Sequence, residues 1–418
     1  MIKLVIIADD LTGSLDTGVQ FTKKNIPTLV ITDLNFDIKS IPEYIEAIVI
    51  DTESRHIDKE EAKERVKSVI AKFDKNSVKH FYKKIDSTFR GNVGKELEGL
   101  MEGLGTKELY FVPAFPDSGR IIKKGILYVN GTKITDTQFA KDILNPITDD
   151  YIPNILKQST DMKVLTYNEK KSGITDSAIY LFDSESKADM LEIGKELFEK
   201  NLLFCTAGSA GFAEVLADYV KNDINSTDIK ISDSRILFIC GSVNVTSLNQ
   251  CKYAEKNNFP STALNFYNLI SEDCSKLSNY EIVKEELNNK VLENQHLLIK
   301  TSAKDEVIKD AIEYAKNNNL KIENLTENIA NNVGRITKDL IVENNLQNLI
   351  VFGGDTLIGI LKNLECSSVI PLKEISSGVV FTKALCKDRE INIITKAGGF
   401  GKENVIDEIK EFINKIKV

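Results

Sequence analysis

The sequence has few of the residues that build metal centres and disulfide frameworks. Three histidines are widely separated among 418 residues, so the chain offers no zinc-ligand spacing. The six cysteines form no CxxC pair and no regular framework; they are Cys205, Cys240, Cys251, Cys274, Cys366 and Cys386. Cysteines without such patterns are typically reduced residues in the core of a cytoplasmic protein. We therefore expect a cytoplasmic protein, and the sequence assigns no residues to a metal site.

The sequence also lacks long hydrophobic runs and an excess of positive charge. No apolar run approaches the length of a membrane span, and Asp9 and Asp10 interrupt an N-terminal run too short for a signal peptide. Lysine and arginine total 54 against 62 aspartates and glutamates, and the net charge of −8 disfavours nucleic acid or an anionic membrane as partner. We expect a soluble protein with neither partner. A homodimer is compatible with the sequence.

The length of the chain predicts two domains, because a single core rarely grows beyond about 250–300 residues. The polar segment 221–233 lacks periodicity and is the best linker. We expect domains over residues 1–225 and 234–418. Each half alternates strands with helices, which predicts an α/β fold in which each domain has a mainly parallel sheet flanked by helices.

Strands are expected wherever a short apolar run ends at a polar turn. In the first half these runs are 4–8, 44–50, 79–85, 108–112, 176–183 and 202–205, with a hairpin at 119–131. In the second half they are 235–240, 295–300, 348–352 and 391–395. Helical periodicity follows most of these runs and closes the chain at 403–416.

The turns after the first four strands share their charge. Each contains a carboxylate, and three also contain Arg55, Arg90 or Arg120. Parallel strands share one carboxyl edge, so these side chains should converge on one cleft. Arginine binds carboxylate or phosphate bidentately, and carboxylates accept hydrogen bonds from hydroxyls. This pattern predicts a site for a small anionic, hydroxylated ligand, within reach of Lys83 or Lys84. Taken alone, Asp10 is better explained as a helix cap.

The strand ends of the second half carry glycine, serine and threonine instead. They lie at 241–242, 353–356 and 396–401, where backbone N–H groups can approach phosphate oxygens closely. Lys396 adds a movable positive charge, but the chain has neither a Walker A motif nor a GxGxxG after the first strand. A polar cleft in the first half and a phosphate site in the second half predict phosphoryl transfer from ATP to a substrate hydroxyl. We expect the two sites to face each other across an interdomain cleft, with Mg²⁺ as cofactor.

Six motifs together resemble the four-carbon acid sugar kinase family, in order and over nearly the whole chain. They are Ala8-Asp-Asp-Leu-Thr-Gly13, Lys84-Ile-Asp-Ser-Thr-Phe-Arg-Gly-Asn92, Pro113-Ala-Phe-Pro116 with Gly119-Arg120, Gly241-Ser242, Gly353-Gly-Asp-Thr356 and Lys396-Ala-Gly-Gly-Phe-Gly401. Enzymes of that family phosphorylate threonate, erythronate or 3-oxo-tetronate with ATP. The resemblance implies an acid-sugar-binding N-terminal domain and an ATP-binding C-terminal domain.

The resemblance also implies site residues. Those for the sugar acid are Asp10, Arg55, Lys84, Ile85, Asp86 and Ser87, to which the charge pattern adds Arg90. Those for the nucleotide are Ser242, Gly353, Gly354, Asp355, Thr356, Gly399, Phe400 and Gly401, to which the charge pattern adds Lys396. The sequence departs from the family at Ile126, where the family hairpin often has histidine, and at Ala397, where the last loop more often has serine.

Our hypothesis is that Arg55 and Lys84 hold the substrate carboxylate, while Asp10 and Asp86 hold its hydroxyls. The catalytic base is Asp10, Asp86 or Asp355, and the sequence does not choose among them. A haloacid-dehalogenase-like phosphatase is disfavoured because Ala8 occupies the position of its nucleophile. A non-catalytic sugar-acid sensor would not explain the loop at 396–401, and a nicotinamide-dependent dehydrogenase would need the missing glycine fingerprint.

Overall fold

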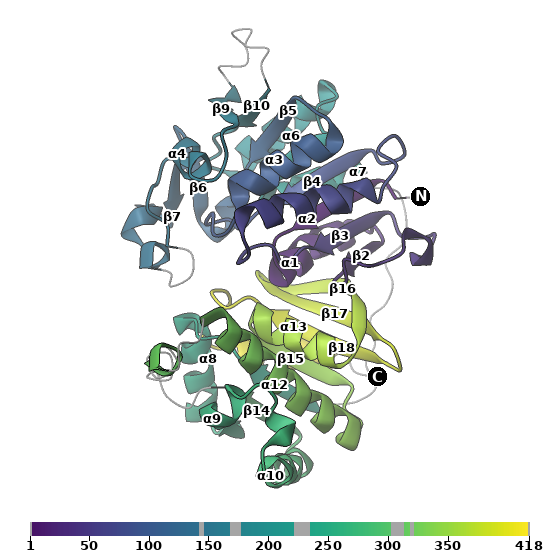
Figure 1. Ribbon diagram of the computed structural model, residues 1–418, viewed down its shortest axis with the longest axis vertical. Coiled ribbons are helices and arrows are strands. Elements are labelled where there is room, and N and C mark those ends of the chain that lie inside the picture. The colour runs from purple at the N-terminus through teal and green to yellow at the C-terminus, as the bar shows by residue number, and fades with distance from the viewer. Residues whose placement is uncertain are drawn as a thin grey trace. The chain divides into compact units, whose positions relative to one another are not determined.

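The computed structural model describes residues 2–141, 146–167, 177–220, 235–301, 313–317 and 322–416. The chain forms two compact units, Met1–Ser226 and Thr227–Val418. The predicted linker at 221–233 lies outside the described residues. The units are described one at a time below (Figure 1).

The sheet of the first unit has the strand order β2-β3-β1-β4-β11-β5-β10-β9, and neighbouring strands are parallel. Its strands are β1 (Leu4–Ala8), β2 (Thr28–Ile31), β3 (Ala47–Asp51), β4 (His80–Lys84), β5 (Glu108–Val112), β9 (Lys163–Thr166), β10 (Ala178–Leu181) and β11 (Cys205–Gly208). The central strand β1 is wholly buried, as expected of an apolar strand covered on both faces.

Helices pack in layers on this sheet, and an antiparallel sheet of β6 (Arg120–Lys123), β7 (Ile126–Val129) and β8 (Thr132–Lys133) follows β5. The helices of the first unit are α1 (Leu11–Thr22), α2 (Lys59–Ala71), α3 (Val93–Leu104), α4 (Ile152–Lys157), α6 (Lys187–Glu199) and α7 (Ala210–Val220). Short 3₁₀ turns are η1 (Ile38–Ser40), η2 (Pro116–Ser118), η3 (Ile134–Asp136) and η4 (Gln138–Lys141). Helix α2 packs beside α3, and α1 packs beside α7 (Figure 1). The predicted hairpin at 119–131 is confirmed.

The sheet of the second unit has the order β13-β14-β12-β15-β18-β17-β16, parallel as far as β18 and antiparallel from β18 to β16. Its strands are β12 (Ile236–Cys240), β13 (Ser261–Ala263), β14 (His296–Lys300), β15 (Asn348–Phe352), β16 (Cys366–Ser376), β17 (Val379–Cys386) and β18 (Glu390–Lys396). Its helices are α8 (Val245–Lys256), α9 (Phe266–Leu269), α10 (Tyr280–Glu293), α12 (Ile322–Asn344), α13 (Gly354–Asn363) and α14 (Val405–Ile416), with the turn η5 (Cys274–Lys276). The expected α/β fold with mainly parallel sheets is confirmed.

The structure also differs from the sequence-based expectations. Strands β2, β8, β9, β13, β16 and β17 were not predicted, and β11 lies three residues beyond its predicted start. The β16–β17 hairpin contains register shifts, which disrupt the alternation that identifies a strand in sequence. Within it, Cys366 and Cys386 face each other and form a disulfide, so the expectation of six reduced cysteines is wrong for this pair. The other four cysteines are free and buried.

The described helices show no membrane-spanning character. Within the described ranges, none is both long enough and apolar enough to cross a bilayer.

Candidate active site

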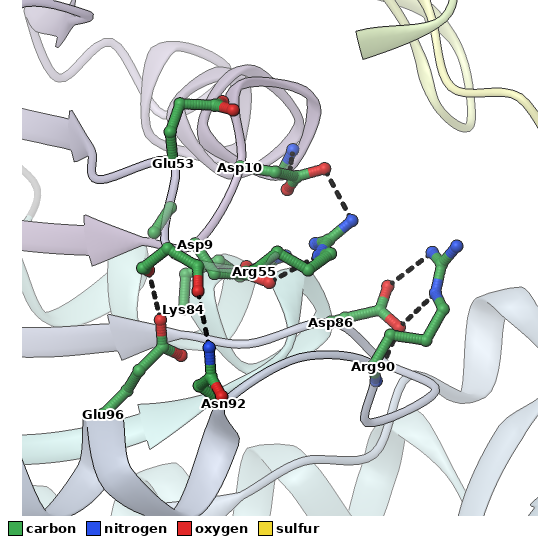
Figure 2. A network of polar contacts seen from close by, with 12 residues as sticks. Asp9, Asp10, Glu53, Arg55, Lys84, Asp86, Arg90, Asn92 and Glu96 are labelled. Carbon is green, nitrogen blue, oxygen red and sulfur yellow. Dashed lines mark hydrogen bonds and ion pairs between the residues drawn. The ribbon is translucent and has the colours of Figure 1, made fainter. Parts of the chain in front are cut away.

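The site of the first unit begins where β1 ends and α1 starts. Asp10 is the N-cap of α1, and its Oδ1 accepts a hydrogen bond from the Gly13 backbone N–H at 2.9 Å. Its other oxygen, Oδ2, forms an ion pair with Arg55 Nη1 at 2.8 Å (Figure 2). The cap and the charged contact therefore coexist on one side chain. A Cβ at Gly13 would lie 2.6 Å from Asp10 Oδ1 and 2.9 Å from Lys84 Nζ, so glycine lets both side chains close over this turn.

Arg55, which follows β3, joins both aspartates of the first turn. Its Nε donates to Asp9 Oδ2 at 2.6 Å while Nη1 faces Asp10. Asp9 is almost fully buried, whereas 21% of the Asp10 side chain is exposed. The sequence analysis assigned no role to Asp9. The paired aspartates did carry a signal for such a role. Successive residues after a strand point to opposite sides, so Asp9 can hold Arg55 from within while Asp10 faces the site.

The turn after β4 supplies a second carboxylate–arginine pair. Arg90 donates from Nε to Asp86 Oδ2 at 2.9 Å and from Nη2 to Asp86 Oδ1 at 3.0 Å, a bidentate fork. The Thr88 hydroxyl and backbone N–H and the Arg90 backbone N–H also donate to Oδ2. Both oxygens of Asp86 are thus engaged within the protein.

The arginines control the protonation of the buried aspartates. Burial alone would raise the pKa of Asp86, but the charges of Arg90 and Arg55 hold that pKa well below its ordinary value. Burial likewise opposes ionisation of Asp9, and the charges of Arg55 and Lys83 outweigh it and lower the pKa. Burial lowers the pKa of Arg120, while the nearby Asp86 raises it and Arg90 lowers it further. The structure thus brings the three predicted arginines into one electrostatic neighbourhood, with ionised carboxylates between them.

The remaining predicted residues of this unit differ in what they can offer. Lys84 Nζ lies beside Gly13, whereas Lys83 on the neighbouring position is buried against Glu96. The strand alternation therefore sends Lys84 to the site and Lys83 beneath it. Ile85 has a fully buried side chain, so only its backbone could meet a ligand, while Ser87 is partly exposed at the turn.

The glycine loops of the second unit converge at the ends of three adjacent strands, β12, β15 and β18. A Cβ on Gly241 would overlap the Thr356 hydroxyl, and a Cβ on Gly398 would lie 2.8 Å from Ser242 Oγ. Gly353 has φ +114°, and a Cβ there would lie 3.2 Å from the Ser242 backbone nitrogen. Glycine is required at these places because backbone meets backbone and hydroxyl.

Helix α13 starts in this cluster, and no N-cap side chain accepts hydrogen bonds from its first backbone N–H groups. Gly353 is the N-cap and carries no side chain to accept from the first-turn N–H groups. Asp355 lies in that first turn and is exposed, and Gly399 is exposed on the neighbouring loop. These N–H groups and the Ser242 and Thr356 hydroxyls form a site suited to phosphate oxygens.

Lys396 does not serve as a movable charge in this loop. Its ammonium is buried and donates to the backbone carbonyls of Ala397 at 2.9 Å, Gly398 at 3.1 Å and Phe400 at 3.0 Å. Gln250 Nε2 also donates to the Phe400 carbonyl and to two further carbonyls, those of Gly401 and Lys402. Both side chains fix the loop from inside, and burial lowers the pKa of Lys396 to about 8. Sequence analysis missed Gln250, which lies on α8 outside any motif.

The described part of the structure offers no ready-made metal centre. In the parts of the chain that it describes, no three or more histidine, cysteine, aspartate or glutamate side chains are grouped to hold a metal ion. Mg²⁺ in phosphoryl-transfer sites is commonly held by one or two carboxylates and the substrate phosphates. The exposed Asp355 carboxylate beside Thr356 fits that mode of binding.

The two halves of the chain match two different family models. Residues 4–216 match the model of a sugar-binding N-terminal domain, and residues 237–406 match that of a nucleotide-binding C-terminal domain. The molecule is therefore a two-domain protein of the class that these two family models describe. The chain belongs to the four-carbon acid sugar kinase family.

Several curated relatives span nearly the whole chain. The D-threonate kinase of Salmonella typhimurium is 24% identical and covers 99% of each chain. The D-erythronate kinase of Heliobacterium modesticaldum is 26% identical and covers 97% of this chain and 95% of its own. The 3-oxo-tetronate kinase of Pectobacterium atrosepticum is 23% identical and covers 97% of both.

Solved structures show the same fold. One from Salmonella typhimurium has a TM-score of 0.77 at 21% identity and covers 98% of this chain and 99% of its own. One from Haemophilus influenzae has a TM-score of 0.71 at 20% identity and covers 98% and 100%.

Proposed function

We propose that the protein transfers the terminal phosphoryl group of ATP to a hydroxyl of a four-carbon sugar acid, namely threonate, erythronate or 3-oxo-tetronate. The observation that carries the proposal is the alternation of charge at the edge of the first sheet. Arg55 joins Asp9 and Asp10, and Arg90 joins Asp86 (Figure 2). A small ligand with one carboxylate and several hydroxyls complements this pattern. The names of the relatives support the same class of substrate.

In this proposal Arg55 and Lys84 bind the substrate carboxylate. Asp9 and Asp10 take bonds from Nε and one Nη of Arg55, and a guanidinium has five N–H groups in all. Lys84 Nζ lies at the same turn, beside Gly13. Two cations at one end of the ligand would orient its hydroxyls toward Asp10.

We assign the role of proton acceptor to Asp10 rather than Asp86. Asp86 has both oxygens engaged by Arg90 and Thr88 and a strongly lowered pKa, which makes it a weak base. Asp10 is the more exposed of the two and lies at the start of α1. Asp86 would instead bind a substrate hydroxyl and hold Arg90 in place.

The second unit would hold the nucleotide. Backbone N–H groups at 354–356, 398, 399 and 401, with the Ser242 hydroxyl, would bind the phosphates, and Asp355 would hold Mg²⁺ together with them. Mg²⁺ would supply neutralisation of the charge on the transferring group. Lys396 and Gln250 would act indirectly, by keeping the loop in shape. Turnover also requires that the two units bring their ligands together.

A coupled assay tests the proposal. The purified protein is incubated with ATP and Mg²⁺ and with each stereoisomer of threonate, erythronate and 3-oxo-tetronate, and ADP release and the phosphorylated acid are both measured. We expect phosphorylation of at least one acid. Silence across the whole panel would contradict the proposal, and binding of an acid without nucleotide binding would favour a non-catalytic sensor.

A further inference from the structure

We propose that Glu96 on α3 is a positioning residue for the sugar-acid site, acting with Lys83 and Ser54 to fix the turn that carries Arg55. The inference rests on the proposed function, because it assumes that Arg55 binds the substrate. It concerns residues that lie beneath the site and touch no ligand. They are drawn partly in Figure 2, where Glu96 points from its helix toward the turn between Asp9 and Arg55.

A buried ion pair lies at the base of this arrangement. Lys83 Nζ is 3.2 Å from Glu96 Oε2, and the two side chains are 0% and 1% exposed. The same ammonium donates to the Lys84 backbone carbonyl at 3.0 Å. A buried ion pair rarely adds net stability over apolar residues of the same size, and in some proteins it is retained because it fixes a particular geometry. Its place directly under a charged site therefore indicates a role in geometry.

Ser54 links this pair to the strand ends. Its hydroxyl donates to Glu96 Oε1 and lies 2.7 Å from the Thr52 hydroxyl oxygen. Thr52 Oγ1 donates to the Ala8 carbonyl at 2.7 Å, and the Ser54 backbone N–H donates to the Asp9 carbonyl at 3.0 Å. One carboxylate on α3 thereby ties together the ends of β1, β3 and β4. These are the strands that present Asp10, Arg55 and Lys84.

The segment just before Glu96 holds the other side of the same turn. Asn92 Nδ2 donates to the backbone carbonyls of Ser54 at 2.8 Å and Ile57 at 2.9 Å, which bracket Arg55. Gly91 has φ +93°, and a Cβ there would lie 3.0 Å from Arg55 Cγ and 3.2 Å from its Cα. Neighbouring residues therefore hold both the backbone of Arg55 and the aliphatic part of its side chain in place. Its guanidinium has little freedom left except to face Asp9 and Asp10.

The charge of Glu96 depends on its partner. Burial raises the pKa of Glu96, the Lys83 ammonium opposes that rise, and the nearby Asp9 adds to it. Replacing Glu96 alone would leave the buried Lys83 ammonium without its ion-pair partner, and we expect this to destabilise the fold. Three other variants avoid this problem.

The first variant, Ser54→Ala, removes the link and leaves the ion pair intact. The second, Lys83→Met with Glu96→Leu, removes both charges and the acceptor together. The third, Lys83→Met with Glu96→Gln, also removes both charges but keeps an oxygen that can accept from Ser54. Glu98→Gln is the matched control, because Glu98 lies on the same helix and pairs with Lys63 at 2.6 Å, away from Arg55.

Steady-state kinetics with the sugar acid and with ATP are measured for each variant, with thermal unfolding as a check of folding. We expect the KM for the sugar acid to rise about tenfold in the first two variants, while the KM for ATP changes less than about twofold. The third variant should fall closer to the wild type. Glu98→Gln should leave both KM values unchanged.

An unchanged KM for the sugar acid in folded Ser54→Ala and Lys83→Met/Glu96→Leu proteins would overturn the inference. A lowered melting temperature with unchanged KM would overturn it too, because that is the signature of a purely structural pair. Failure of the proposed function looks different. In that case the wild type and Glu98→Gln would themselves phosphorylate no sugar acid.

Discussion

The two units meet their proposed ligands with different parts of the chain. In the first unit charged side chains form the site, and Arg55, Asp9 and Asp10 are joined by contacts of 2.6 and 2.8 Å. In the second unit the backbone forms the site, and the side chains of Lys396 and Gln250 bind loop carbonyls from within. A sugar acid is small and chemically particular, whereas a polyphosphate is a repeated anion. The first needs directed side chains, and the second is satisfied by N–H groups.

This difference predicts which substitutions harm each ligand. In the first unit the exact chemical group should matter, so that even an isosteric change is damaging. In the second unit the space around the backbone should matter, so that a single added methyl group is damaging. Four variants test this, starting with the largest expected effect.

Asp10→Asn should lower kcat by about 10²–10⁴-fold, because it removes a carboxylate that accepts the proton. Asparagine is as good an N-cap as aspartate, so α1 should still form and the thermal stability should change little. The measurement is kcat in the coupled assay, with thermal unfolding alongside.

The control for this variant is Asp58→Asn. Asp58 is the N-cap of α2 and accepts from the Glu60 backbone N–H at 2.8 Å, without any contact to the site arginines. It should retain wild-type turnover. Near-normal turnover in Asp10→Asn would mean that Asp10 is only a cap.

Arg55→Lys should raise the KM for the sugar acid by about 10–100-fold, because an ammonium cannot bridge Asp9 and Asp10 while presenting a fork to the substrate. The KM for ATP should stay within about twofold. Arg335→Lys in the second unit, whose side chain is 42% exposed, is the control and should change neither constant. Equal loss of affinity for both substrates in Arg55→Lys would contradict a separate role for the first unit.

Gly241→Ala should have the opposite selectivity. The added methyl would overlap the Thr356 hydroxyl and push apart the loops after β12 and β15. We expect the KM for ATP to rise about tenfold while that for the sugar acid is unchanged. A Gly241→Ala protein that folds and binds ATP normally would show that this cluster is not part of the nucleotide site.

Asp86→Asn should weaken binding of the sugar acid, as any change of group at this site should, and its effect on stability is the smallest effect that we predict. The folded-state pKa of Asp86 lies well below its unfolded value, so the carboxylate stabilises the fold above about pH 4 and this contribution is lost as the pH falls through the folded pKa. The variant should therefore be less stable than the wild type at pH 7, by about 1 kcal/mol because Arg90 is partly exposed. Urea unfolding at pH 7, 4 and 3 should show the difference shrinking at the lowest pH. A gap that stays constant over this range would contradict the low pKa.

Much of this arrangement could be predicted from the sequence because it depends on strand ends. The charged turns at 9–10, 55, 86–90 and 120 follow apolar runs, and parallel strands bring such turns to one edge. The Gly353–Thr356 loop was found for the same reason. Local pattern and topology were sufficient for both.

The supporting residues could not be predicted in this way. Glu96 and Gln250 lie on helices, where a polar side chain normally means an exposed face, and only the packing shows that both are buried. Lys396 was expected to be movable because sequence gives the charge of a lysine but not the three carbonyls that surround it. Long-range contacts of this kind have no local signature.

Calorimetric titration tests most directly whether the first unit binds the sugar acid and the second unit binds the nucleotide. The sugar acid that the wild type phosphorylates and a non-hydrolysable ATP analogue are each titrated into the wild type, Arg55→Lys and Gly241→Ala. The account predicts that Arg55→Lys loses affinity for the acid alone and that Gly241→Ala loses affinity for the nucleotide alone. A folded variant that loses both ligands together, or loses the wrong one, would contradict it.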